Sequence, residues 1–295
     1  MSESWMSLPA GRKAELTGGI VCDSHMHTLF STDSEAPVRS MLDAAAERGL
    51  KAVCITDHMD LDFPPQEGEE IVDGQTPFWF DVDDYFQALA PLREEYRDRL
   101  DVRIGIEIGL QPHLGSRYRE LVHAYPFDYV IGSVHLIRGL DPYYGKLFEG
   151  RTDKEAYREA FVETLRCLEN VEDFDVLGHL DYVVRYGTHQ AQEYSYREFA
   201  DEIDAVLKKL ISMGRGLEMN TGGLKYGLGF CNPHPDVVKR YRELGGEIIA
   251  IGADAHSPEH VGYGFRQAAE ILKACGFRYY AEYKGRRPEY KRTDL

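Results

Sequence analysis

Short apolar segments that end in histidine or acidic residues recur along the chain, and this pattern constrains the fold more than any other feature. Each segment is followed by a stretch with the periodicity of a helix, in about seven units. Such alternation is typical of a parallel sheet with crossover helices. The expected strands are 19–22, 51–55, 102–106, 129–132, 176–177, 217–219 and 247–251. In a chain of 295 residues this number of strands favours a closed α/β barrel over an open sheet.

The stretches between these strands predict helices, and no linker or repeat divides the chain. The main expected helices are 37–48, 82–99, 154–170, 196–213, 235–244 and 261–275, and a short last strand is expected at 279–281. Residues 63–80 contain turn-forming sequences and predict an irregular loop. We therefore expect a flexible extension at 1–18 and a single domain at 19–295.

Composition limits the classes of partner. The formal net charge of −16 disfavours binding to nucleic acid or to an anionic membrane. Five widely spaced cysteines without a CxxC pair indicate reduced thiols. The first residues lack the apolar stretch of a signal peptide, and no apolar run approaches the ~20 residues of a membrane span. We expect a cytoplasmic monomer or homodimer that acts on a small molecule.

The polar motifs at the strand ends point to metal binding. They are DSHMH, TDH, IE, SVH, GHLD and GADAH. A parallel barrel brings the carboxyl ends of its strands to one mouth, so residues far apart in sequence become neighbours. In extended backbone, residues two apart face the same way, so His25 and His27 can point at one site. Imidazole and carboxylate groups are typical ligands of zinc, manganese and iron.

Simpler explanations exist for each motif taken alone. An isolated HxH is more often incidental, a single buried histidine usually belongs to the core, and Asp57 could cap a helix. Six strand ends that carry such groups are not explained in this way, because burying them without a cation is costly. The remaining histidines lie away from strand ends, where surface or capping roles are expected: His113, His123, His189, His234 and His260.

The ordered motifs resemble the polymerase and histidinol phosphatase (PHP) family over about 20–280, and the segments HTLFSTDSEAP and ITDHMDLDFP resemble its monofunctional histidinol-phosphatase branch. The resemblance implies a distorted (β/α)7 TIM-like barrel with its active site at the carboxyl ends of the strands and three divalent metals (zinc, manganese or iron). The ligands it implies are His25, His27, Asp33, His58, Glu107, His135, His179, Asp254 and His256. Many members carry histidine at the position of Asp33, which could instead form a turn before the first helix.

The resemblance also implies residues that bind phosphate. Arg185 and Lys225 stand where the branch often has arginines. Lysine offers a point charge where arginine offers a planar group with several hydrogen-bond donors. Glu218 and Asn220 follow a strand and could contact the leaving alcohol or order the metal ligands. Asp57 and Asp181 are expected to support neighbouring histidine ligands.

The implied reaction is hydrolysis of a phosphomonoester. The leading hypothesis is L-histidinol phosphate as substrate, giving L-histidinol and phosphate in histidine biosynthesis, by attack of a metal-bridging hydroxide. Arg185 and Lys225 would neutralise the developing charge, and Asp254 or His256 would protonate the leaving group. The alternatives are another small phosphomonoester or a nucleotide as substrate and, in a different class, a metal-dependent amidohydrolase.

Overall fold

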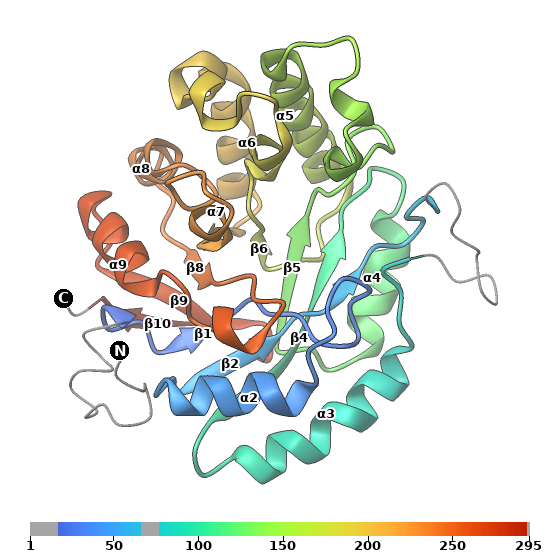
Figure 1. The fold of residues 1–295 in the computed structure, drawn as a ribbon, viewed down its shortest axis with the longest axis vertical. Coiled ribbons are helices and arrows are strands. Elements are labelled where there is room, and N and C mark those ends of the chain that lie inside the picture. Colours follow the sequence, from blue (N-terminus) through green and yellow to red (C-terminus); the bar gives the residue numbers. More distant parts are fainter. Residues whose placement is uncertain (1–16, 66–76, 294–295) are drawn as a thin grey trace.

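The computed structural model describes residues 17–65 and 77–293, and a parallel sheet lies at the centre of this part (Figure 1). The expected extension at 1–18 lies almost entirely outside the described residues, as does 66–76 of the irregular loop. The sheet follows the order β1-β2-β4-β5-β6-β7-β8, and β3 also pairs with β4. Its strands are β1 (Cys22–Asp23), β2 (Ala52–Ile55), β3 (His58–Met59), β4 (Asp101–Gly109), β5 (Tyr129–Ser133), β6 (Val176–Leu177), β7 (Gly216–Asn220) and β8 (Ile249–Gly252).

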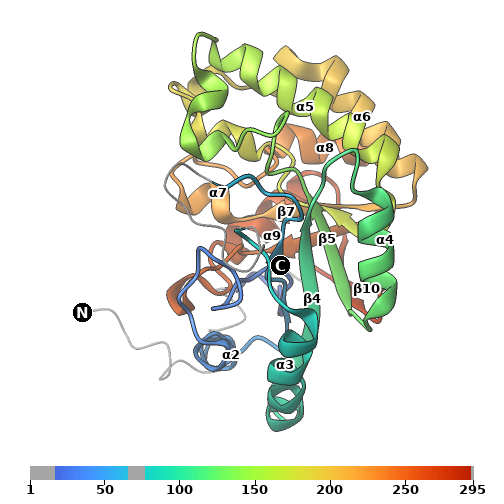
Figure 2. The same ribbon diagram turned by 90° about the vertical axis from the view of Figure 1, so that its right-hand side faces the viewer.

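Helices surround the sheet, as Figures 1 and 2 show. They are α2 (Val38–Glu47), α3 (Val82–Tyr96), α4 (Gly115–Ala124), α5 (Asp153–Asn170), α6 (Ala200–Ser212), α7 (Gly222–Lys225), α8 (Pro235–Glu243) and α9 (Phe265–Ala274). Short 3-10 turns occur as well, among them η2 (Pro142–Tyr144) and η4 (Tyr182–Tyr186). Within the described residues, every helix is too short or too polar to span a membrane.

Local sequence explains where these helices begin and which face they bury. Thr152 and Glu155 form a reciprocal capping box that starts α5. In α9 the buried residues Phe265, Ala268 and Leu272 recur at helical spacing and form one apolar stripe. The helices therefore pack one face against the sheet.

The sheet closes into a barrel through the segments that follow β1 and β8. Met26 forms a parallel bridge with Ala255. The His27 amide donates to the Ala255 carbonyl at 2.8 Å, and the Asp254 amide donates to the His25 carbonyl at 2.8 Å. The predicted distorted barrel is thus confirmed, and its closure brings the first and last histidine motifs together.

Side chains on β4 show that the two ends of the barrel carry different charged groups. Val102, Ile104, Ile106 and Ile108 alternate along the strand and belong to the core shared with the helices. The other face carries Arg103, Gly105, Glu107 and Gly109. Arg103 lies near the start of the strand and Glu107 near its carboxyl end, so the two charges point to opposite ends of the barrel.

A hairpin of β9 (Tyr279–Lys284) and β10 (Arg287–Arg292) lies at the end where Arg103 points. Arg103 donates to the Tyr283 carbonyl at 3.1 Å and to Glu282 at 3.2 Å. Tyr283 packs with Tyr129 at the start of β5. The predicted last strand is therefore longer than 279–281 and pairs with a strand that was not predicted.

Candidate metal centre and pocket

Glu107 lies at the centre of a buried histidine cluster. Its Oε2 lies 3.3 Å from His25 Nε2 and 2.8 Å from His58 Nδ1. Its Oε1 lies 3.0 Å from His179 Nε2 and 3.3 Å from His135 Nε2. Histidines from four separate strand ends thus meet one carboxylate, as the barrel geometry predicts.

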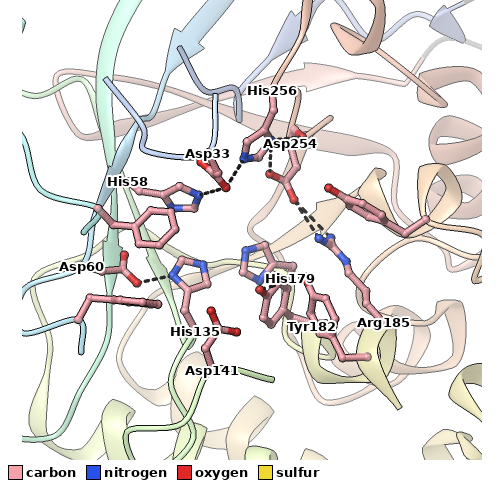
Figure 3. Close-up of a pocket in the computed structure, with 14 residues that line it drawn as sticks. Asp33, His58, Asp60, His135, Asp141, His179, Tyr182, Arg185, Asp254 and His256 are labelled. Carbon is pink, nitrogen blue, oxygen red and sulfur yellow. Dashed lines mark hydrogen bonds and ion pairs between the residues drawn. The ribbon is translucent and has the colours of Figure 1, made fainter. Parts of the chain in front are cut away.

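A second group of ligand atoms surrounds Asp254 (Figure 3). Asp254 Oδ1 lies 3.4 Å from His27 Nε2 and 3.6 Å from His256 Nδ1. His256 Nε2 is 3.1 Å from Asp33 Oδ2, and the same oxygen is 3.7 Å from His58 Nε2. The structure therefore brings every predicted ligand into one cluster, with Asp33 at its partly exposed edge.

The rings of His25 and His27 are each held by a hydrogen-bond partner on Nδ1, the nitrogen that faces away from the cluster. His25 Nδ1 lies 2.6 Å from Glu218 Oε1. Since the carboxylate accepts, His25 Nε2 is left with a lone pair that faces the cluster. Gly252 makes room for this pair, because a Cβ there would lie 2.2 Å from His25 Cβ and 2.8 Å from Glu218 Oε1.

His27 is oriented through Ser31. Ser31 Oγ donates to Asp57 Oδ1 at 2.7 Å, so its oxygen accepts from His27 Nδ1 at 3.0 Å. His27 Nε2 therefore also carries a lone pair, and it lies 3.0 Å from His25 Nε2. Asp57 thus supports His27 through a hydroxyl, and its neighbour His58 is not its partner in any side-chain contact of the described residues.

Two facing nitrogens need a positive charge between them, which a second proton on His25 supplies in the metal-free protein and a metal ion supplies when it displaces that proton. Although burial opposes the charged form, Glu218, Glu107 and Asp254 hold the pKa of His25 well above its usual value. Burial and the nearby His58 lower the pKa of His27 well below the usual value. Two convergent lone pairs beside buried carboxylates fit a divalent cation, and the donor types suit zinc, manganese or iron.

Several sets of ligand atoms lie close enough to hold such ions. Glu107 Oε2 is buried and lies 2.8 Å from His58 Nδ1, but the two atoms do not have hydrogen-bond geometry. The sets with ligand atoms within 4.8 Å of one another at this site are His27–His58–His256, His25–His27–Asp254, His58–Asp60–His135 and Glu107–His135–His179. Asp33 belongs to none of these sets. The residues present therefore fit more than one metal ion.

A pocket opens over this cluster (Figure 3). Metal-ligand candidates line one side, and aromatic and acidic side chains line the rest. Its lining residues are Asp33, His58, Asp60, Phe63, Phe78, His135, Asp141, His179, Tyr182, Arg185, Tyr186, Tyr226, Asp254 and His256. A ligand in this pocket contacts the metal cluster and an aromatic wall together.

Arg185 is the buried cation of the pocket. Its Nε donates to Asn232 Oδ1 at 3.0 Å, and both Nη atoms lie 3.3 Å from Asp254 Oδ2. The guanidinium packs over the Tyr182 and Tyr226 rings at 5.2 and 4.8 Å. This position fits the predicted contact with a phosphoryl group.

Asp181 and Asn220 act on the same arginine. Asp181 Oδ1 accepts from Asn232 Nδ2 at 2.5 Å, which orients the amide that holds Arg185. Asn220 is buried and accepts from Arg185 Nη2 at 3.3 Å. Asp181 was expected to support His179, but its contacts place it behind the arginine. The position of Asn220 likewise favours an ordering role over contact with the alcohol.

Lys225 and Glu218 do not line the pocket. Lys225 Nζ donates to the Asp254 carbonyl at 3.0 Å and lies 4.7 Å from the centre of the Tyr226 ring. Burial lowers the pKa of Lys225. Glu218 lies behind His25, and its Oε2 accepts from the His179 amide at 3.0 Å. Of the two roles expected for Glu218, these contacts favour ordering the metal ligands.

Asp60, Asp141 and Tyr182 are pocket residues that the motifs did not single out. Asp60 stands two residues after His58, which was a usable signal. Asp141 caps the 3-10 turn η2 by accepting from the Tyr143 amide at 2.8 Å, and burial raises its pKa. No local sequence feature indicates that Asp141 lines the pocket.

The other histidines and the cysteines lie outside the centre, as expected. His113 and His123 are exposed and pair with Asp62 and Asp173. His234 accepts from the Asp236 amide and so caps α8. All five cysteines are buried and free.

The barrel and the cluster define a metal-binding protein of the β/α barrel class. The family model of the PHP domain matches residues 23–222, and the chain belongs to this family. A probable histidinol-phosphatase of Clostridium acetobutylicum is 35% identical over 259 residues, which cover 88% of this chain and 95% of the relative. A histidinol-phosphatase of Lactococcus lactis is 30% identical and covers 89% of this chain and 94% of its own.

A solved structure is similar over nearly the same length. It is histidinol phosphate phosphatase from Lactococcus lactis, in complex with zinc, L-histidinol and phosphate. The TM-score is 0.81 at 30% identity, and the match covers 92% of this chain and 99% of that one.

Proposed function

We propose that this protein is a metal-dependent phosphomonoesterase that hydrolyses L-histidinol phosphate to L-histidinol and phosphate. The observation that carries the proposal is that the histidine cluster, Arg185 and an acidic aromatic wall meet in one pocket. Support comes from the Lactococcus lactis phosphatase, whose structure holds zinc, L-histidinol and phosphate.

Three divalent metals are held by the predicted ligands in this proposal. Glu107 and Asp254, each in contact with several histidines, would provide carboxylate ligands for these ions. When bound, the metals supply Lewis acidity toward the phosphoryl oxygens and a water of lowered pKa. The cluster makes a local positive site in a chain with net charge −16, which reconciles an acidic protein with an anionic substrate.

Arg185 orients the phosphoryl group. A guanidinium has five N–H donors, and the protein engages four of them in hydrogen bonds to Asn232, Asn220 and Asp254. The fork is therefore fixed before substrate binds, with one N–H left for a phosphoryl oxygen. A fixed donor next to developing negative charge stabilises the transition state without reorganisation.

The acidic and aromatic part of the pocket receives the alcohol. Asp141, Tyr182 and Phe78 belong to this part, and Tyr182 also packs against Arg185. An aromatic wall with a carboxyl group suits an organic cation, because a ring face and a carboxylate both attract positive charge. The amine and imidazole of histidinol match this chemistry.

Protonation of the leaving alkoxide falls to His256. Burial opposes ionisation of Asp254, but His25, His27 and Arg185 hold its pKa well below the usual value. An ionised carboxylate has no proton to donate. His256 also lines the pocket and is the remaining candidate of the two, and as the proton donor it would not serve as a metal ligand at the same time.

The test is a panel of esters assayed with metal-reconstituted protein: L-histidinol phosphate, p-nitrophenyl phosphate and a nucleoside monophosphate. We expect kcat/KM to be highest for L-histidinol phosphate. Equal values across the panel would refute the substrate assignment, while preference for the nucleotide would assign the protein to another phosphoesterase activity. Hydrolysis of an amide substrate without phosphatase activity would favour the amidohydrolase alternative.

The cellular setting belongs to the same proposal. Five buried free thiols suit a reducing cytoplasm, and the net charge of −16 gives no attraction to nucleic acid or anionic lipid. We propose a monomer or homodimer, which light scattering distinguishes, and a single catalytic domain from residue 19 onward.

A further inference from the structure

The segment after β3 is fixed against the end of β4 by a buried tyrosine. Tyr118 of α4 has its hydroxyl 3.1 Å from the Leu61 amide, from which it accepts. The same hydroxyl donates its one proton to the Gly109 carbonyl at 2.7 Å and lies 3.1 Å from the Met59 carbonyl. This clamp determines where Asp60 lies, between Met59 and Leu61.

The carboxylate of Asp60 occupies the space that Gly109 leaves. A Cβ at Gly109 would lie 2.4 Å from Asp60 Cγ and 2.5 Å from Oδ2. Only glycine on this inward-facing position of β4 allows the carboxylate to reach the pocket. The carboxylate is thus held from both sides, and Asp60 is 2% exposed.

From this position Asp60 contacts the ring of His135. Its Oδ2 lies 2.7 Å from His135 Nδ1 (Figure 3). A carboxylate accepts, so Nδ1 carries the proton and the lone pair lies on Nε2. That nitrogen is 3.3 Å from Glu107 Oε1 at the centre of the cluster. The second oxygen, Asp60 Oδ1, is buried and has no hydrogen-bond partner among the described residues.

We propose that Asp60 is a positioning residue that fixes the tautomer and orientation of His135 for metal binding through Nε2. Carboxylates that support a histidine ligand in this way typically contribute 10- to 100-fold in metal affinity. The inference rests on the metal-binding part of the proposed function and is independent of the substrate. It competes with a role as direct ligand, because Asp60 also lies within ligand distance of His58 and His135.

The experiment measures zinc affinity by titrating chelated, folded protein against a chromophoric chelator. Asp60→Ala is expected to weaken one zinc equivalent about 10- to 100-fold, and Asp60→Asn, which keeps an acceptor, by less. Asp173→Ala is the matched control, since Asp173 also pairs with a histidine, the exposed His123 at 3.0 Å, and does not line the pocket. It should leave zinc affinity unchanged.

A double-mutant cycle separates positioning from direct ligation. His135→Asn identifies the equivalent concerned, and in that background Asp60→Ala is expected to have no further effect. A further loss of affinity there would show that Asp60 acts directly and would overturn the proposal. Wild-type affinity in Asp60→Ala would overturn it as well.

A measurement on the wild-type protein covers the case in which the variants do not fold. In zinc-loaded protein with 15N-labelled histidine, the His135 ring should show a protonated Nδ1 and a metal-bound Nε2. Binding through Nδ1 would refute the proposal. Because neither readout uses turnover, a wrong substrate assignment would leave both results intact.

Discussion

Replacement of Arg185 by lysine tests most directly whether the fixed guanidinium of Arg185 orients the phosphoryl group. The change keeps one positive charge but removes the planar geometry. Arg185 lines the pocket and makes four hydrogen bonds within the protein, at 3.0 to 3.3 Å, which leaves one N–H for a ligand. Lysine has three donors on one atom and cannot hold Asp254, Asn220 and Asn232 while also reaching a phosphoryl oxygen.

The variant loses one hydrogen-bond donor that is already in place when negative charge develops on the phosphoryl group. Such a loss typically costs ~2.7–4 kcal/mol, which corresponds to a reduction of kcat by about 100- to 1000-fold. The fold should survive, because each acceptor left without its donor costs about 1–3 kcal/mol and the lysine ammonium can still donate to some of the three acceptor residues. We therefore expect a modest decrease in Tm and unchanged metal content.

The assay is steady-state hydrolysis of L-histidinol phosphate by metal-saturated protein, with metal content measured on the same sample. Arg39→Lys is the control, because Arg39 forms a two-point contact with Glu95 on the surface. That variant should match the wild type. If Arg185→Lys kept kcat within about threefold of wild type at equal metal content, the assigned role of the fork would be wrong.

The remaining predictions concern metal and protons. Purified protein should carry about two to three equivalents of zinc, manganese or iron, and His135→Asn should lower this content and abolish turnover; unchanged turnover would contradict the ligand assignment. Asp60 and Glu107, against the effect of burial, raise the pKa of His135 to about 10, so zinc must displace a proton from this ring, and zinc affinity should rise with pH until about pH 10. An affinity independent of pH would speak against this coupling. Hydrogen bonding to Arg240 lowers the pKa of Asp204 to about 2, so its stabilisation is present above the unfolded pKa near ~3.9 and is lost as pH falls toward 2. In chelated protein, the Tm difference between wild type and Asp204→Asn should shrink over that interval, and a constant difference would exclude the ion pair.

The fold and the cluster were largely predictable from sequence. A parallel barrel converts the local pattern of strand followed by histidine into one shared site, so His25 and His179 could be assigned to the same cluster without knowledge of their distance. The exact strand bounds were less predictable, because β1 and β6 have only two residues each and are defined by their pairing. The β10 strand was missed because its RPEYKR sequence is polar and contains proline, and it exists through pairing with β9.

The residues that support the ligands were harder to predict, since their partners are distant in sequence. Asp57 was expected to support the adjacent His58, but neighbouring residues in extended backbone point to opposite faces. Asp57 instead reaches Ser31, 26 residues away. The position of Asp60 depends on Gly109, and nothing in either segment alone indicates the contact.

The inward face of β4 combines these observations. Its residues alternate a charged side chain with glycine: Arg103, Gly105, Glu107, Gly109. The glycines are needed because a Cβ at Gly105 would lie 2.7 Å from both Cys54 Sγ and the Tyr129 carbonyl, and one at Gly109 would displace the Asp60 carboxylate. Arg103 binds the hairpin that covers one end, and Glu107 gathers the histidines at the other. Because alternate residues of β4 face the barrel interior, this one strand binds the hairpin at one end of the barrel and the histidine cluster at the other.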